Sequence, residues 1–134
     1  MSTLLLPVDD SEERARRQAR TIESLPFAVD ELSVTILHVF SDNPEGASVG
    51  QFAPARTAAR ILSEAGIETQ LEEQSGEPAD VIIEYAEAID AEMICVAGRK
   101  RSPAGKLLFG SVSQQVILGT ERPVLVGGSI PESG

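Results

Sequence analysis

Apolar runs alternate with amphipathic segments along most of the chain. Residues 3–8 (TLLLPV) and 33–40 (SVTILHVF) are apolar or β-branched almost throughout, which is typical of strands covered on both faces of a sheet. Residues 12–25 and 78–90 instead carry apolar side chains at three- and four-residue spacing, which predicts amphipathic helices. The chain therefore begins as strand, helix and strand.

The same two patterns continue toward the end of the chain. Further helices are predicted over residues 54–65 and 111–118, and further strands over residues 67–73, 93–98 and 122–126. Strands that alternate with helices predict an α/β fold, built as an open parallel five-stranded sheet with helices on both faces. At 134 residues the chain has the length of one domain, so we expect a single domain over residues 1–134.

Two segments show neither pattern. Residues 41–52 (SDNPEGASVGQF) have the Gly, Pro, Asn and Ser content of a surface loop, and this is the longest loop that we expect. The tail, residues 127–134, is expected to be frayed. No internal repeat is present.

The charge of the chain is acidic and unevenly distributed. Asp and Glu number 21 against 11 Lys and Arg, which gives a formal net charge of −10. Four of the eleven cations lie close together between positions 99 and 106, namely Arg99, Lys100, Arg101 and Lys106. A positive segment on an acidic body predicts a site for an anionic ligand.

The composition also bears on the cellular setting. An acidic, lysine-poor surface suits a cytosol of very high salt, where screening removes self-repulsion; a halophilic source is one hypothesis, and an ordinary acidic cytosolic protein is the other. The N-terminus lacks the features of a signal peptide and no run approaches a membrane span, so we expect a cytoplasmic protein without membrane contact. Nucleic-acid binding is not expected, because it needs cations spread over a broad face.

Residues that often carry chemistry are few in this sequence. Cys95 and His38, the only cysteine and the only histidine, both lie inside apolar runs and are expected to be structural. Asp9 and Asp10 follow the first strand, where they would either hold Mg²⁺ or, together with Ser11, cap the next helix; we favour capping. No catalytic residue and no dedicated metal site is predicted.

A ligand site is nevertheless expected at one edge of the sheet. In open parallel sheets ligands bind beyond the carboxyl ends of the strands, which selects Asp9, Ser41 and the basic segment after Gly98. Gly110 and Ser111 then open a helix, whose first N–H groups and positive dipole end would hold a phosphate. The alternative is that these two residues are only a turn and a helix cap.

Two common phosphate-binding motifs are excluded. Lys106 is followed by Leu107, and no glycine lies five residues before Gly105, so the chain is not a P-loop NTPase. The segment PVDDSE stands after the first strand where a dinucleotide-binding fold carries GxGxxG.

Several segments together resemble another family of phosphate-binding proteins. They are LLLPVDDSE, VTILHV, GEPADVIIEYAEAIDAEMICVAG and GSVSQQVILGTERPVLV, and they are similar to the universal stress protein family. The resemblance covers nearly the whole chain. It implies strand order 3-2-1-4-5 in a Rossmann-like, adenine nucleotide α-hydrolase-like fold, and it implies ATP as the ligand, with Mg²⁺ as an accompanying ion left open.

The glycine motif of the nucleotide-binding members is only partly present. Those members carry Gly, two residues, Gly, nine residues, Gly and then Ser or Thr, and here Gly110 and Ser111 match the last pair. Counting back places Ala97 and Lys100 at the two earlier glycine positions. Either the arginines and lysine supply charge in place of close backbone approach, or ATP binding is weakened or lost; we favour retained binding.

The resemblance implies a role for each matching position. Asp9 and the backbone of Val39 would face the nucleoside, Ala97 and Gly98 would lie along the ribose and first phosphates, and Gly110 would begin the segment that holds the later phosphates. The full set of nucleotide-contacting residues that we expect is Pro7, Val8, Asp9, Val39, Ala97, Gly98, Lys100, Arg101, Gly110, Ser111, Val112 and Ser113. In the last four, backbone N–H groups and the two serine hydroxyls would bind the β- and γ-phosphates.

The resemblance further implies a homodimer through the last strand, at Pro123, Val124, Leu125 and Val126. The preferred hypothesis is a cytosolic stress-response protein that binds ATP or a related adenine nucleotide as a regulatory ligand, with slow hydrolysis at most. The alternative is a nucleotide-free dimeric interaction module, in which residues 41–52 and the basic segment contact another protein. A ligase of the related architecture is disfavoured, because no glycine follows the first strand.

Overall fold

The computed structural model describes residues 1–41, 48–101 and 104–127. Its strands are β1 (Ser2–Pro7), β2 (Leu32–Phe40), β3 (Glu68–Ser75), β4 (Met93–Arg101), β5 (Leu107–Phe109) and β6 (Val124–Gly127). Its helices are α1 (Glu12–Glu23), α2 (Ala53–Glu64), α3 (Pro78–Ala88) and α4 (Ser111–Gly119), with 3₁₀ turns η1 (Val29–Glu31) and η2 (Val49–Gln51). The tail predicted to be frayed began at Gly127, but Gly127 ends β6 and pairs with Ala97; the rest of that tail, residues 128–134, lies outside the described residues. Half of the predicted long loop, residues 42–47, lies outside them as well.

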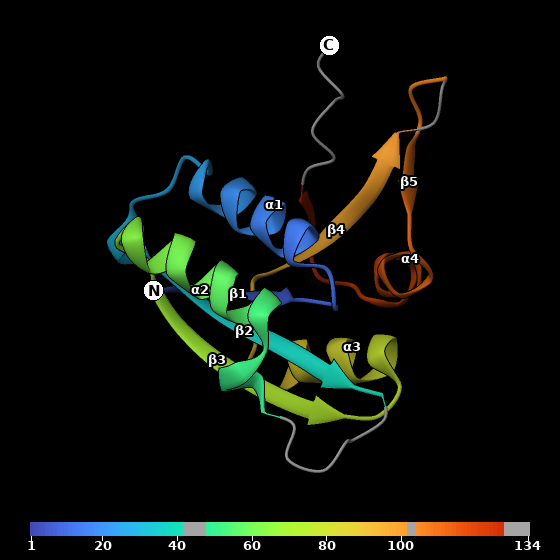
Figure 1. The fold of residues 1–134 in the computed structure, drawn as a ribbon, viewed down its shortest axis with the longest axis horizontal. Coiled ribbons are helices and arrows are strands. Elements are labelled where there is room, and N and C mark those ends of the chain that lie inside the picture. Colours follow the sequence, from blue (N-terminus) through green and yellow to red (C-terminus); the bar gives the residue numbers. More distant parts are fainter. Residues whose placement is uncertain (42–47, 102–103, 128–134) are drawn as a thin grey trace.

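A parallel sheet forms the centre of the molecule (Figure 1). The strands follow the order β3-β2-β1-β4, and β6 pairs in parallel with the first half of β4. The register between β1 and β2 pairs Ser2 with Leu32 and continues to Pro7 with Leu37. The predicted α/β class, the mostly parallel sheet and the strand order 3-2-1-4-5 are therefore confirmed, with β6 as the fifth parallel strand.

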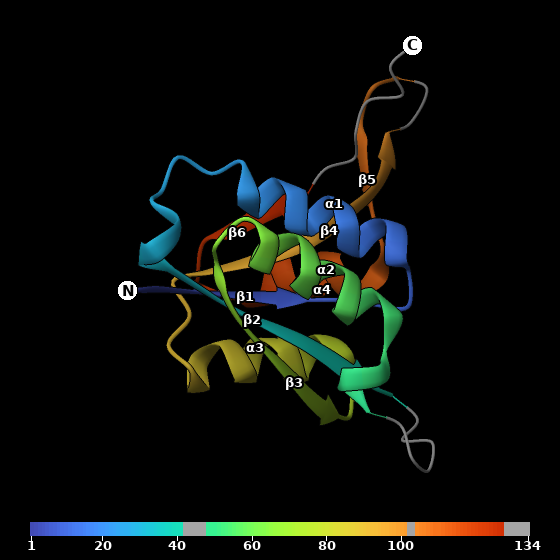
Figure 2. The ribbon, with the colours of Figure 1, turned by 60° about the vertical axis from the view of Figure 1, so that its left-hand side comes forward.

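The helices cover both faces of this sheet (Figures 1 and 2). Helices α1 and α2 pack on one face, where Leu4 and Leu6 of β1 point into their core. Helices α3 and α4 pack on the other face, toward which Leu5 points. Because side chains alternate along a strand, one apolar run supplies both cores, which explains why β1 is apolar at consecutive positions.

Helix α1 begins with the capping predicted from the sequence. Ser11 is the N-cap, and its Oγ accepts a hydrogen bond from the Arg14 N–H at 3.1 Å. Glu12 and Glu13 lie in the first turn, where the positive end of the helix dipole favours acidic side chains. The helix ends at Glu23, two residues before the predicted end, and the chain turns before Pro26.

The segment after Gly98 differs from the prediction. A basic loop was expected there, but β4 continues to Arg101 and pairs antiparallel with β5, which the sequence did not predict. Gly98 pairs with Phe109, and Arg101 pairs with Leu107. This hairpin projects beyond the body of the sheet (Figure 2). Pairing across the hairpin satisfies backbone groups that a loop would leave to water, and it overrides the low strand propensity of an Arg-Lys-Arg run.

Cys95 lies in the middle of β4 and is fully buried. Burial raises the pKa of its thiol to about 12, because the thiolate would lose its hydration. The expected inert core thiol is consistent with this position. In the part of the chain that the structure describes, no helix is long and apolar enough to cross a membrane.

We predict that Cys95 does not react with a thiol reagent in the folded protein. With its pKa raised to about 12, the thiolate population near pH 8 is about a thousandfold lower than for an exposed cysteine, and the side chain is also inaccessible. Labelling with an aromatic disulfide should be complete in denaturant and at least about a thousandfold slower without it, because a factor of about a thousand already follows from the thiolate fraction alone. Equal labelling rates in the two conditions would contradict the burial of this strand.

Candidate functional site

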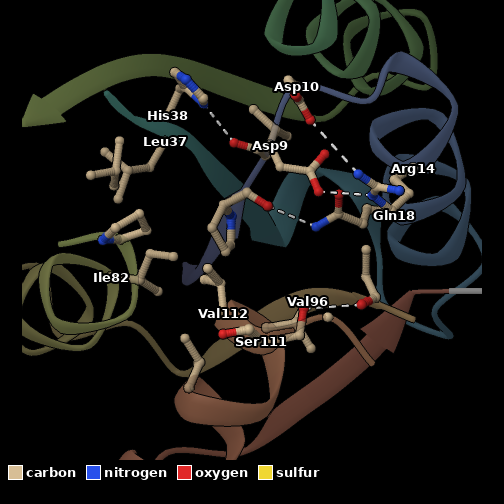
Figure 3. Close-up of a pocket in the computed structure, with 18 of the residues that line it drawn as sticks. Asp9, Asp10, Arg14, Gln18, Leu37, His38, Ile82, Val96, Ser111 and Val112 are labelled. Carbon is tan, nitrogen blue, oxygen red and sulfur yellow. Dashed lines mark hydrogen bonds and ion pairs between the residues drawn. The ribbon is translucent and has the colours of Figure 1, made fainter. Parts of the chain in front are cut away.

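A cavity of about 430 Å³ opens at the carboxyl ends of the parallel strands. Its walls come from the ends of β1, β2 and β4, from the first turns of α1 and α4, and from α3. Figure 3 shows three groups of side chains around it: Asp9, Arg14 and Gln18 on one wall; Leu37, His38 and Ile82 on a second; Ser111 and Val112 on a third. This is the crevice expected where neighbouring strands send their helices to opposite faces of a sheet.

Most of the residues expected at the site line this cavity. They are Pro7, Val8, Asp9, Val39, Ala97, Gly110, Ser111, Val112 and Ser113. Gly98 is not among the lining residues, because it is buried within β4 and paired with Phe109. Lys100 and Arg101 belong to the hairpin by their backbone, and their side chains lie outside the described part of the structure.

Other lining residues were not on the expected list. They are Asp10, Arg14, Gln18, Leu37, His38, Phe40, Ser41, Pro78, Ile82, Val96, Arg99 and Val116. Arg14 and Gln18 are four residues apart, so they share the side of α1 that faces the cavity. Their spacing in the sequence could have predicted this, because the helix that follows the strand end at Pro7 would turn these two residues toward a site there. The contributions of α3 depend on tertiary packing and had no comparable signal.

The first turn of α4 presents backbone donors to the cavity. Gly110 is the N-cap, and within the described residues no side chain accepts a hydrogen bond from the first N–H groups of this helix. The first bond of the helix is donated by the Gln114 N–H to the Gly110 carbonyl, so the amides of Ser111, Val112 and Ser113 precede it. The positive end of the helix dipole therefore faces the cavity, and none of the described side chains caps it.

The two serine hydroxyls of α4 are not equivalent. Ser113 donates its hydroxyl hydrogen to the Ala97 carbonyl at 3.0 Å, which ties α4 to the end of β4. Ser111 accepts a hydrogen bond from Gln115 at 3.0 Å and so keeps its own hydrogen for another acceptor. Of the two hydroxyls expected to bind phosphate, only that of Ser111 is therefore available as a donor in this arrangement.

Arg99 lies beside this helix terminus because β4 is irregular there. The register with β5 shifts between Gly98 and Lys100, so Arg99 sits in a bulge, a feature that redirects a side chain out of the regular alternation. Its guanidinium packs on Gly110: a Cβ built on that glycine would lie 2.8 Å from Arg99 Nε. Among the described residues Arg99 forms no ion pair, so its charge adds to that of the helix dipole.

Asp9 is held by the protein at the opposite wall. One of its carboxylate oxygens accepts the Ser11 N–H at 2.9 Å, and the other accepts Arg14 Nε at 2.8 Å. Asp10 lies 3.7 Å from the same guanidinium and is more exposed. Within the described residues, no group of three or more His, Cys, Asp or Glu side chains could hold a metal ion. Both aspartates therefore serve the start of α1 and the ion pair with Arg14.

His38 has a structural environment, as expected, but it also borders the cavity. Its ring stacks on Phe52 at 3.9 Å between centroids and meets Phe40 edge-on at 4.5 Å. Nδ1 lies 2.7 Å from the Val8 carbonyl, which can only accept, so Nδ1 carries the hydrogen. This bond joins the ends of β1 and β2 beneath the cavity.

Comparison with known proteins agrees with this geometry. The model of the universal stress protein family matches residues 1–127. The chain belongs to the universal stress protein family. It is 36% identical over 69 residues to the stress response protein NhaX of Bacillus subtilis, an alignment that covers 52% of this chain and 42% of that protein. The chain spans half or less of the length of the curated relatives that it matches.

Solved structures of this family share the fold along nearly the whole chain. A universal stress protein from Archaeoglobus fulgidus superposes with a TM-score of 0.74 at 29% identity, covering 96% of this chain and 99% of that one. A universal stress protein of the same organism in complex with dAMP superposes with a TM-score of 0.69 at 25% identity, covering 96% and 98%. The family and the α/β architecture predicted from the sequence are thereby confirmed.

Proposed function

We propose that this universal stress protein binds an adenine nucleotide, ATP in particular, in the cavity at the strand ends. The observation that carries the proposal is the uncapped first turn of α4 with the guanidinium of Arg99 packed beside it. Three consecutive amides, a helix dipole and an arginine make a site for a phosphate group in an otherwise acidic protein. Binding of dAMP by the Archaeoglobus fulgidus relative supports a nucleotide as the source of that phosphate.

The opposite side of the cavity suits a nucleobase. Leu37 and Val39 from β2 and Ile82 from α3 are apolar side chains at its wall. A flat aromatic base gains hydrophobic contact there, and the backbone at the end of β2 offers polar groups at its rim. A nucleotide would thus span from the β2 end, over β1, to the first turn of α4.

We propose regulation by binding rather than turnover. Hydrolysis of ATP requires a group that positions or deprotonates a water next to the γ-phosphate. The carboxylate of Asp9 is committed to Ser11 and Arg14, and His38 lies on the β2 wall of the cavity, on a different wall from Ser111 and Val112, where the later phosphates would lie. Hydrolysis should therefore be slow at most. Where Mg²⁺ takes part, it would enter the cavity bound to the phosphates of the nucleotide. The proposal also includes a cytoplasmic location and a role in the stress response.

We predict that purified protein binds ATP and that Arg99→Gln weakens this binding about tenfold, the effect of one charged hydrogen bond. Isothermal titration in the presence of Mg²⁺ measures both affinities. Because Arg56 is an exposed arginine on α2, outside the cavity, Arg56→Gln is the matched control and should leave the affinity unchanged. Because one hypothesis from the composition is a halophilic source, the titration is carried out at about 0.1 M and at about 1 M salt. No heat and no melting shift at either salt would overturn the proposed function.

We also predict that Gly110→Ala weakens nucleotide binding without unfolding the protein. The φ of Gly110 is −74°, which alanine adopts readily, but the new methyl group would displace the guanidinium of Arg99. The affinity should fall about threefold, while the free energy of unfolding should change by about 1 kcal/mol or less, the cost of a poorer helix cap. Gly50→Ala is the control, since its Cβ would meet only Ser48 Oγ at 3.6 Å. Unchanged affinity in Gly110→Ala would show that Arg99 takes no part.

A homodimer through β6 is part of the proposal. Among the described strands β6 pairs only with β4, so its other edge is open. Elsewhere on the described surface, Leu108 of β5 and Leu118 of α4 are large apolar side chains that are exposed. Open strand edges and exposed apolar side chains are both typical of surfaces that pair with a second copy.

We predict that Leu118→Glu converts the dimer to a monomer, measured by light scattering coupled to size exclusion. Leu118 is 78% exposed, so the substitution should change the stability of the monomer by less than about 0.5 kcal/mol. Phe27→Glu, also at an exposed apolar position but in the connection from α1 to β2, should leave the dimer intact. A dimer that persists in Leu118→Glu would exclude this face, and a dimer without nucleotide binding would favour the alternative of an interaction module.

A further inference from the structure

Gln18 is a buried polar side chain of α1 that reaches the floor of the cavity. It is 1% exposed, and Figure 3 shows it on the same wall as Asp9 and Arg14. Its Nε2 donates to the Pro7 carbonyl at 2.8 Å and to the Cys95 carbonyl at 2.9 Å. The carboxamide therefore connects the last residue of β1 to Cys95 within the neighbouring strand β4.

These two bonds determine which way the carboxamide faces. Both partners are carbonyl oxygens, which can only accept, so the nitrogen must face them and both of its hydrogens are used. The oxygen Oε1 is left on the other side. In the described part of the chain it accepts no hydrogen bond, and it is not sealed from the cavity that Gln18 lines. An acceptor that faces a cavity and has no protein donor can take a hydrogen bond from a donor group of a bound ligand.

The position of Oε1 identifies the part of a nucleotide that would meet it. The phosphate subsite lies at the first turn of α4, and the apolar wall lies at the end of β2. Between these two lies β1, whose last residue, Pro7, is a hydrogen-bond partner of Gln18. A nucleotide with its base at one end and its phosphates at the other has its sugar in between, and the sugar carries hydroxyl donors.

We propose that Gln18 Oε1 accepts a hydrogen bond from a ribose hydroxyl, so that this protein prefers ribonucleotides to deoxyribonucleotides. The inference rests on the proposed nucleotide function and adds a specificity-determining residue to it. The carboxylates of Asp9 and Asp10 also line the cavity near Arg14, but both lie against its guanidinium, and each Asp9 oxygen already has one protein donor, whereas Gln18 Oε1 has none among the described residues. Gln18 Oε1 is thus the acceptor on this wall to which a sugar hydroxyl would donate a hydrogen bond.

The test compares ATP, 2′-deoxy-ATP and 3′-deoxy-ATP by isothermal titration of the full chain. Loss of one neutral hydrogen bond should weaken binding of one deoxy ligand by about fivefold relative to ATP. Gln18→Met keeps the size of the side chain and removes the acceptor, so it should bind all three ligands equally. Gln70→Met, at an exposed position of β3 away from the cavity, is the matched control and should retain the preference.

Each outcome decides between distinct conclusions. Equal affinity of the wild-type protein for the three ligands would overturn this inference alone, whereas no binding of any of them would overturn the proposed function as well. Preference lost in Asp9→Asn but kept in Gln18→Met would assign the hydroxyl to Asp9. Gln18→Met removes the donor of two buried carbonyls, so its folding is checked by thermal melting. If Gln18→Met does not fold, the Asp9→Asn variant decides. A preference for ATP that is retained in Asp9→Asn supports the proposal, and a preference that is lost in Asp9→Asn overturns the proposal.

Discussion

The crevice between β1 and β4 is the constraint on which the rest of the structure depends. Helix α1 leaves β1 toward one face of the sheet and α4 leaves β4 toward the other, so no helix covers the two neighbouring strand ends. Gln18 holds the crevice together by donating to the Pro7 and Cys95 carbonyls. Gly127 packs so closely on α1 that a Cβ there would lie 2.8 Å from the Cα of Gln18. The walls of the site are therefore set by buried polar bonds as well as by apolar packing.

Much of the fold could be predicted because the burial of a strand or helix determines the pattern of apolar residues in its sequence. Strands covered on both faces must be apolar at consecutive positions, as in β1 and β2, and helices on a sheet must be amphipathic, as α1 is. The short strand β5 has no such pattern of apolar residues. Three residues show no period, and their pairing with β4 depends on a turn that brings distant positions together. The hairpin was therefore mistaken for a loop.

The site was predictable only in part, and for a similar reason. Strand ends and a helix start can be located from the sequence, which is why Asp9, Ser41 and Ser111 were expected at one edge of the sheet. The same rule selected the basic segment that begins with Arg99, but the packing of its guanidinium on Gly110 could not be predicted, because it follows from a bulge in β4. Gln18 could have been found from its spacing to Arg14, but its two carbonyl partners come from separate strands and appear only in the folded chain.

Under the proposed function, Arg99 would compensate for the glycines of the family motif that are missing here. Glycines let the backbone approach a phosphate closely, which places several N–H donors around it. Here Ala97 and Lys100 stand at those positions, β4 runs on into a hairpin, and a side chain provides the positive charge instead. An exposed guanidinium is screened by salt, whereas the amides at the start of α4 lie at the cavity and act at short range. A molecule with a net charge of −10 repels anions at long range, so a phosphate that binds in the cavity would have to be attracted by positive groups at short range. Within the described residues, Arg99 and the first turn of α4 are placed side by side to supply that attraction.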